Sequence, residues 1–395
     1  MIMSTNIEWT DETWNPVTGC TKVSQGCKHC YAEREWGRLS ANPKATAYYG
    51  RAFTDVRCHP ERLSAPLRWT KPRKVFVNSM SDLFHEAVPF EFIAAVFGTM
   101  ALAPQHTFQI LTKRPQRMRD FFDWIRREAG SPGARPGEET VLCALRWRRA
   151  AVDTPASLKH VCLSRPVWPL PNVHLGVSIE DQPTADERIP LLFESPAALY
   201  WVSAEPLLVA PDISDWLTPE FSCSGFVQGQ SMEDGYCGHC AGHATDPIHV
   251  GPQRAIGWVV AGGESGPRAR ATHPDEARSL RDQCAEAGVP FLWKQWGEWL
   301  AIDQGEGNWY RTLYHSNRAA RPGEDQSVLD DLYGRHCVVP QLCLRAGGDH
   351  VDMRAPNAFL QGTRPVQAFR IGKKAAGRLL DGVLYDTYPD EVHRA

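Results

Sequence analysis

The sequence has little net charge, no long hydrophobic run and no internal repeat. Its 43 basic and 46 acidic side chains give a formal charge of −3, so the chain as a whole has no electrostatic attraction to nucleic acid or to an anionic membrane. No run of about 18 apolar residues is present, and the first residues have neither a basic leader nor an apolar signal core. We therefore expect a cytoplasmic protein without a membrane partner.

Twelve cysteines are present among the 395 residues. In a long chain without a secretion signal, cysteines serve more often as metal ligands, catalytic thiols or small buried hydrophobes than as disulfide partners. The length exceeds that of one small domain, so we expect one large domain with insertions, or two domains.

Short apolar runs rich in β-branched and aromatic residues recur along the chain, and small, polar or charged residues follow each run directly. The runs are 75–77, 107–111, 173–177, 199–202, 258–261 and 290–293. Helical spacing is found between several of them, at 90–103, 184–193 and 274–287. This alternation predicts an α/β fold with a parallel sheet. Ligands of such sheets bind at the carboxyl ends of the strands, where the polar residues fall.

Two stretches do not fit this alternation. Residues 130–171 are rich in Arg, Pro and Gly, and residues 218–254 are rich in Gly, His and Cys. Both are too long for ordinary connections between a strand and a helix, so we interpret them as insertions.

Three cysteines, Cys20, Cys27 and Cys30, lie within eleven residues after the apolar segment 14–18. A structural zinc site normally has four protein ligands, whereas three ligands leave a coordination position open for a substrate or cofactor. Thiolates also favour iron–sulfur clusters, and a glycine-flanked loop exposes backbone N–H groups to cluster sulfurs. A closed zinc site remains the alternative, with three candidates for the fourth ligand: His29, Cys58 and His59.

The cysteine stretch resembles a known kind of cofactor loop. Asn-Pro-Val-Thr-Gly-Cys at 15–20 and Gly-Cys-Lys-His-Cys-Tyr-Ala at 26–32 are similar to the cluster loop of radical S-adenosylmethionine enzymes, most of all those similar to spore photoproduct lyase. Those enzymes usually space the first two cysteines by three residues, and this chain has six. The whole chain resembles the phage Gp37/Gp68 family of three-Cys-motif proteins. The segments that carry this likeness are 7–10, 77–84, 111–115, 262–266, 291–297 and 372–374.

The resemblance implies a fold and an activity. Residues 1–300 would form a partial (β/α)6 TIM-like barrel containing both insertions, and residues 301–395 a C-terminal extension packed on it. Cys20, Cys27 and Cys30 would bind three irons of a 4Fe–4S cluster, and S-adenosyl-L-methionine would bind the fourth through its amino and carboxylate groups. A 5′-deoxyadenosyl radical would then attack the substrate. Nucleic acid or a nucleotide is the expected substrate, and a separate partner protein remains open.

S-adenosylmethionine needs a cation for its carboxylate and acceptors for its ammonium and ribose groups. Lys113 is our candidate for the carboxylate, because its Thr-Lys pair resembles that of the lyase-like enzymes. Polar residues after other strands are candidates for the remaining groups: Ser79, Asp82, Ser178, Glu180, Glu205 and Glu264. Each of them could instead be a solvated strand end or a helix N-cap.

The second insertion carries its own group of metal-ligand residue types. Its members are Cys223, Cys237, Cys240 and His243. Zinc bound to them would organise a loop of low apolar content, and an ordinary loop with incidental thiols is the competing interpretation.

Two other functions remain open from the sequence. A non-enzymatic zinc-binding, nucleic-acid-binding protein would use both cysteine groups and the basic stretches 146–149 and 373–378, although we expect these stretches to be solvated helix faces. A nucleotide-binding enzyme without iron would use the glycines of 262–266, whose spacing matches no phosphate-binding motif.

Overall fold

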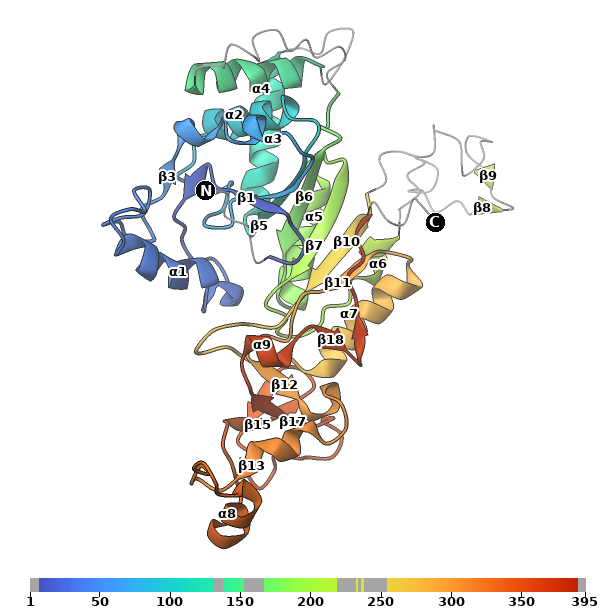
Figure 1. Cartoon of the computed structure of the whole chain (residues 1–395). Helices are drawn as coiled ribbons and strands as arrows, with labels where there is room; N and C mark the ends of the chain where they lie inside the picture. The colour runs from blue at the N-terminus through green and yellow to red at the C-terminus, as the bar shows by residue number, and fades with distance from the viewer. Residues whose placement is uncertain are drawn as a thin grey trace.

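A parallel sheet of seven strands forms the centre of the molecule (Figure 1). The structure is a computed structural model that describes residues 7–130, 138–152, 167–218, 232–233, 236–237 and 254–389. The strands lie side by side in the order in which they occur along the chain, and every pairing is parallel. In that order they are β1 (Glu12–Trp14), β4 (Lys74–Val77), β5 (Thr107–Thr112), β6 (Val173–Ser178), β7 (Leu199–Ala204), β10 (Ile256–Ala261) and β11 (Phe291–Trp293).

Helices connect the strands and flank the sheet. They are α1 (Tyr31–Ser40), α2 (Phe90–Ala101), α3 (Pro115–Ala129), α4 (Glu138–Ala151), α5 (Gln182–Phe193), α6 (Ser214–Leu217) and α7 (Pro274–Glu286). Six of the seven strands are each followed by at least one of these helices before the next strand of the sheet. The fold is therefore mixed α/β with a half-barrel sheet flanked by helices, as the strand–helix alternation predicted.

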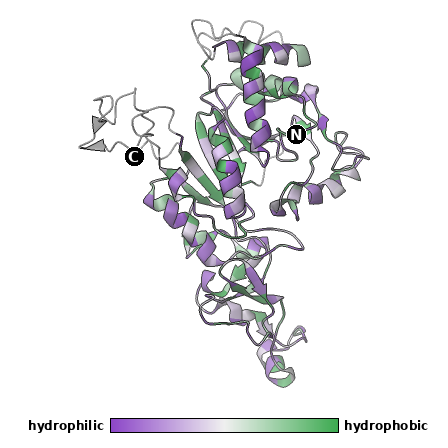
Figure 2. Cartoon of the chain, turned by 180° about the vertical axis from the view of Figure 1, so that it is seen from behind, coloured by the Kyte–Doolittle hydropathy of each residue, from purple (hydrophilic) through white to green (hydrophobic). Residues whose placement is uncertain are grey.

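The sheet is apolar on both faces, as expected of parallel strands covered on both sides. All six residues of β6 are buried, and Figure 2 shows the central strands as the hydrophobic part of the chain. One face packs against the helices, and the other carries an aromatic cluster in which Trp9, Trp201 and Trp258 contact one another. Tryptophan thus serves largely to fill the core.

Helix α4, which lies within the predicted insertion at 130–171, packs into the core. It packs against α2 and α3, and an added Cβ on Gly98 would overlap the backbone of Ala144. Arg148 of α4 is completely buried against α2. Its guanidinium donates to Thr99 Oγ1 and Ser64 Oγ, both at 3.2 Å. The expectation that residues 146–149 form a solvated basic face is therefore wrong for Arg148.

The second insertion contains the short strands β8 (Met232–Glu233) and β9 (Tyr236–Cys237), which pair with each other. Three of the four residues of the predicted zinc group, Cys223, Cys240 and His243, lie outside the described residues. Zinc binding there stays a prediction.

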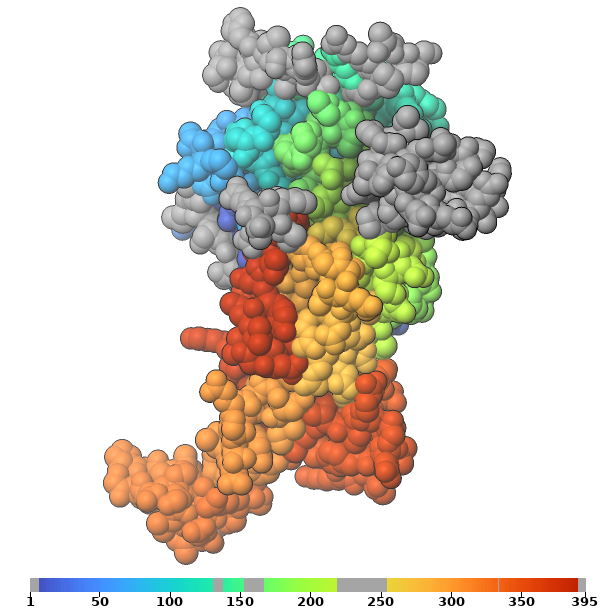
Figure 3. All heavy atoms as spheres, turned by 90° about the vertical axis from the view of Figure 1, so that its right-hand side faces the viewer, coloured from blue at the N-terminus to red at the C-terminus, as the bar shows by residue number. Residues whose placement is uncertain are grey.

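The C-terminal extension forms a second, antiparallel sheet below the first (Figure 1). Its strands lie in the order β12 (Trp299–Ala301), β17 (Val366–Arg370), β15 (Gln341–Arg345) and β16 (Asp349–Val351). Helix α8 (Gln326–Tyr333) projects from its far end (Figure 3). Helix α9 (Lys373–Ala376) confirms the short basic helix expected near the C-terminus.

Smaller strand pairs complete the described secondary structure. They are β2 (Val17–Thr18) with β3 (Arg57–Cys58), β13 (Tyr314–His315) with β14 (His336–Cys337), and β18 (Leu379–Leu380) with β19 (Val383–Leu384).

The last described residues return to the edge of the parallel sheet. Trp293 N–H donates to the carbonyl of Tyr385 at 3.0 Å, and Asp386 forms an antiparallel bridge with Leu292 of β11. Tyr388 Oη donates to the carbonyl of Glu8 at 2.8 Å. Within the part of the chain that the structure describes, no helix is both long and apolar enough to cross a membrane.

Candidate functional site

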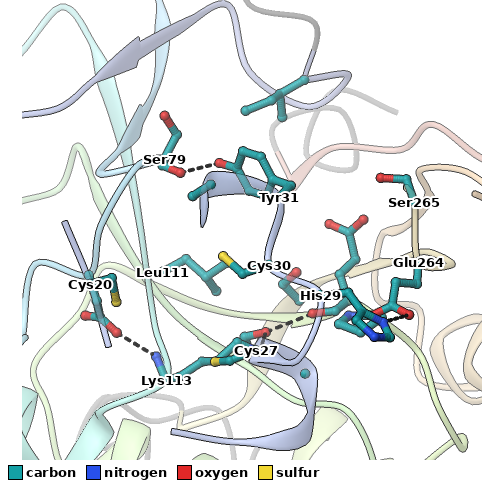
Figure 4. Close-up of a pocket in the computed structure, with 18 of the residues that line it drawn as sticks. Cys20, Cys27, His29, Cys30, Tyr31, Ser79, Leu111, Lys113, Glu264 and Ser265 are labelled. Carbon is teal, nitrogen blue, oxygen red and sulfur yellow. Dashed lines mark hydrogen bonds and ion pairs between the residues drawn. The ribbon is translucent and has the colours of Figure 1, made fainter. Parts of the chain in front are cut away.

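A cavity of about 510 Å³ lies at the carboxyl ends of the parallel strands (Figure 4). The cysteine segment, residues 19–31, contributes all three thiols to its wall, and residues at or just after the ends of β4, β5, β6, β7, β10 and β11 contribute most of the predicted polar side chains. Trp9, Phe76, Arg34 and Lys373 also line it. Of the seven predicted cofactor-binding residues, six line the cavity: Ser79, Asp82, Lys113, Ser178, Glu205 and Glu264. The seventh, Glu180, contacts the lining residue Lys113.

The cysteine segment crosses the carboxyl edge of the sheet from its first strand toward its far side. Ser24 Oγ donates to Glu180, two residues after β6, at 2.9 Å. His29 Nδ1 lies 3.0 Å from Glu264 Oε2, three residues after β10, and Arg270 donates to the carbonyl of Gln25 at 3.1 Å. The segment therefore lines the cavity and is attached to the sheet edge at two places, after β6 and after β10.

The three cysteines are partly buried, and two of them have raised pKa values. Burial, together with the negative charge of Asp82, raises the pKa of the Cys20 thiol to about 12 against the opposing effect of Arg114. Burial also raises the pKa of Cys30. A metal that binds these thiols must displace their protons. Within the described ranges, no three Cys, His, Asp or Glu side chains form a group that could hold a single metal ion.

Asp82 is used to organise the site rather than to face a ligand. Its carboxylate accepts hydrogen bonds from Thr112 Oγ1 at 2.8 Å and from the backbone N–H groups of Lys113 and Phe84. Arg114 also donates to it, at 3.2 Å. The residue lines the cavity as predicted, but these four donors occupy its oxygens.

Lys113 is placed beside the other predicted residues of the β6 edge. Its Nζ donates to Ser178 Oγ at 2.8 Å and forms an ion pair with Glu180. Glu180 is 1% exposed and also pairs with the buried Arg188 at 3.2 Å. Two cations therefore surround one carboxylate, and this corner of the cavity has a net positive charge.

The loop after β4 is fixed by the first strand. Asn78 has a φ of 64°, a left-handed conformation that asparagine tolerates better than most residues. The side chain of Asn15 accepts from Met80 N–H at 2.9 Å and from Ser79 Oγ at 3.2 Å. Tyr31 Oη donates to the carbonyl of Ser79. Ser79 thus reaches the cavity from a loop that both β1 and the cysteine segment hold.

A second lysine–glutamate pair forms the far wall of the cavity. Lys294 Nζ lies 3.0 Å from the carboxylate of Glu205, and both side chains are more than four-fifths buried. The pair crosses over Gly262, since an added Cβ on this glycine would lie 2.8 Å from Glu205 Oε1. Lys294 follows β11 directly, so its position after a strand was the signal by which sequence analysis could have found it.

Glu264 joins the cysteine segment to the β10 edge. Burial raises its pKa, but the hydrogen bonds from Arg270 and His29 outweigh burial and hold the pKa below the usual range. The neighbouring Gly263 lies against the backbone of Trp296, where an added Cβ would overlap it. Close backbone packing therefore explains this glycine without a bound phosphate.

One family matches most of the residues of this chain, and the extent of the match shows that the chain is a member of it. A family described as "Protein of unknown function (DUF5131)" matches residues 4–389. The chain belongs to this family. No curated protein and no solved structure matches it. The likeness to the phage Gp37/Gp68 family and to radical S-adenosylmethionine enzymes therefore stays a prediction.

Proposed function

We propose that this member of the DUF5131 family is a radical S-adenosylmethionine enzyme. In this proposal Cys20, Cys27 and Cys30 bind a 4Fe–4S cluster, and the parallel sheet is the (β/α)6 part of a partial barrel, which the six strand–helix units support. The observation that carries it is the presence of three thiols and the cationic Lys113 corner in one cavity at the carboxyl edge of the sheet.

The residues present fit such a cofactor. Thiols are the ligands that iron–sulfur clusters prefer, and the cavity volume of about 510 Å³ is in the range of sites for small organic ligands. Two lining side chains, each at least nine-tenths buried, have polar atoms without a partner among the described residues: Asn78 Nδ2 and Gln295 Oε1. A ligand with both hydrogen-bond acceptors and donors would satisfy them.

The chain's own residues would bind and orient the cofactor. Lys113 would hold the methionine carboxylate, because Arg188 neutralises Glu180 and leaves the Lys113 charge available. Ser178 and Ser79 present hydroxyl groups to the same space. Glu205 would accept from ammonium or ribose groups, and Glu264 would keep the cysteine segment closed over them.

The bound cofactor would supply a 5′-deoxyadenosyl radical, formed with methionine when one electron from an external reductant cleaves a carbon–sulfur bond of the sulfonium. The radical would remove a hydrogen atom from the substrate. The protein's part would be to exclude water, to which the cysteine segment would contribute as part of the cavity wall attached to Glu180 and Glu264.

A nucleotide or nucleic acid is the substrate class we propose. Trp9 and Phe76 contribute aromatic side chains to the cavity wall, and Arg34 and Lys373 contribute positive charge to it. Aromatic surface and positive charge together suit a base and a phosphate. A separate partner protein stays open.

Anaerobic reconstitution with iron and sulfide tests the cofactor. We expect about four irons per chain, a broad visible absorbance and the release of 5′-deoxyadenosine from S-adenosylmethionine under reducing conditions. Cys27→Ala should abolish all three, whereas Cys337→Ala, in the C-terminal extension, should abolish none. Purified protein that binds zinc at Cys20, Cys27 and Cys30 and never takes up iron would overturn the proposal and favour a zinc-binding, nucleic-acid-binding protein.

A further inference from the structure

Arg114 connects the first thiol to the sheet. It follows Lys113 after β5 and is 6% exposed. One guanidinium nitrogen, Nη1, lies 3.7 Å from Cys20 Sγ and 3.2 Å from Asp82. The other, Nη2, donates to the carbonyl and to Oγ1 of Thr21 at 3.0 and 2.9 Å. This single side chain therefore contacts both the sulfur and the backbone beside it.

The orientation of the guanidinium is fixed from its other side. Its Nε donates to both carboxylate oxygens of Glu86, at 3.0 and 3.1 Å. Asp82, which Arg114 also contacts, is itself held by Thr112 and by backbone N–H groups. Because the guanidinium is planar and all three of its nitrogens are engaged, it cannot rotate away from Cys20 without losing several hydrogen bonds.

Such a contact has a particular use in this cysteine segment. Six residues separate Cys20 from Cys27, and a flexible loop of that length would not by itself place two sulfurs for one cluster. The Cys27 end is attached to the sheet through Ser24 and Glu180. Arg114 supplies the corresponding attachment at the Cys20 end, through Thr21 as well as through sulfur.

We propose that Arg114 is a positioning residue that holds Cys20 ready to bind iron and that, by donating to the Cys20 sulfur, makes the bound cluster easier to reduce. This inference rests on the proposed function. Hydrogen bonds to cluster sulfurs and nearby positive charge stabilise the reduced, more negative cluster, and outer residues of this kind also orient the ligand.

The test compares three variants of the reconstituted full chain. Arg114→Met removes the charge and the hydrogen bonds, and Arg114→Lys keeps the charge. Arg119→Met removes an arginine of the following helix, α3, that pairs with Glu194. Iron affinity is measured by competition with a chelator, and the reduction potential by a dye-mediated titration followed by electron paramagnetic resonance.

We expect Arg114→Met to weaken iron binding about 10- to 100-fold and to shift the potential of the remaining cluster to more negative values. Arg114→Lys should restore part of the potential, and Arg119→Met should match the wild type in both measurements. Wild-type affinity and potential in Arg114→Met would overturn the inference while leaving the proposed function in place.

A measurement without metal distinguishes failure of the proposed function from failure of the positioning role of Arg114. Hydrogen–deuterium exchange of the peptide that contains Cys20 in the apoprotein, followed by mass spectrometry, should be at least several times faster in Arg114→Met than in Arg119→Met, at equal helical content by circular dichroism. If the wild type binds no iron, the proposed function fails, and equal exchange rates in the two variants would then overturn the positioning role as well.

Discussion

Ser24 and Glu180 are joined by a hydrogen bond of 2.9 Å although 156 positions separate them in the chain. The bond attaches the cysteine segment to the fourth strand of the sheet, β6, and Glu180 is in turn held by Lys113 and Arg188. The segment that carries the thiols and the corner that would hold the cofactor therefore share one buried carboxylate.

Replacing Gly26 by alanine should disturb this shared carboxylate. An added Cβ would overlap Glu180, and Lys113 and Arg188 prevent that side chain from moving aside. We expect a loss of about 1–3 kcal/mol in the free energy of unfolding, measured by urea denaturation, together with weaker iron uptake. Gly37→Ala is the control, because its Cβ would meet nothing within 4 Å and helix α1 would gain from alanine. Equal stability of the two variants would contradict the proposed overlap.

Lys113→Met should weaken the binding of S-adenosylmethionine to the reconstituted protein. Loss of a charge-assisted hydrogen bond to the carboxylate corresponds to about 10- to 100-fold in the dissociation constant. Equilibrium dialysis with labelled S-adenosylmethionine measures it. Glu180 keeps its pairing with Arg188 in this variant, so the fold should be retained. The exposed Lys71→Met should bind like the wild type, and unchanged affinity in Lys113→Met would remove Lys113 from the cofactor site.

Arg148 and Arg149 are adjacent arginines, one buried and one exposed. Their replacement should therefore change the free energy of unfolding to different extents. Arg148 is buried between α2 and α4 and donates to Ser64 and Thr99, whereas Arg149 is exposed. Arg148→Met should lower the free energy of unfolding by about 2–3 kcal/mol, because buried hydroxyl groups lose their partner. Arg149→Met should stay within about 0.5 kcal/mol of the wild type. Thermal and urea unfolding of both variants provide the comparison.

Asp381 gives the attachment of the C-terminal extension a pH dependence. The hydrogen bond from Arg278 holds the pKa of Asp381 well below its usual range, against burial and with further help from Gln304 and Arg281. A carboxyl group with a lowered folded-state pKa stabilises the fold above its unfolded pKa, and this contribution is lost as the pH falls toward the folded pKa. We therefore expect Asp381→Asn to be less stable by about 1–2 kcal/mol at neutral pH.

The difference between wild type and Asp381→Asn should be constant above about pH 5 and should shrink at lower pH. Asparagine tolerates the positive φ of 54° at this position, so the backbone itself adds little cost. Asp282→Asn, which removes an exposed partner of Arg281, is the matched control. A difference that grew on acidification would contradict this account.

Much of the parallel sheet could be predicted from the sequence, because six of its seven strands are short apolar runs that polar or small residues follow, whereas β1 has the sequence Glu-Thr-Trp and gives no such signal. The run at 173–177 became β6, and the helical spacing at 274–287 became α7 with only the end shifted. The polar residues after the strands came together because parallel strands end at one edge.

Contacts between distant side chains could not be predicted in the same way. Arg114 was missed because an arginine after a strand has no sequence feature that distinguishes burial against a thiol from solvent exposure. Helix α4 was taken as part of an insertion because its arginines mask the apolar side that packs against α2. Asp82 was correctly placed on the cavity, but the four donors that occupy it come from loops whose folding the sequence pattern does not specify.

The return of residues 385–388 to β11 and to Glu8 has a consequence for the order of events during synthesis. A growing chain folds from its N-terminus as it leaves the ribosome, yet the edge strand β11, which pairs with β10 on one side, is covered on its other side by residues 385–387. Lys373, which lines the cavity, is also made late. The cavity therefore has its complete wall only after Lys373 has been translated.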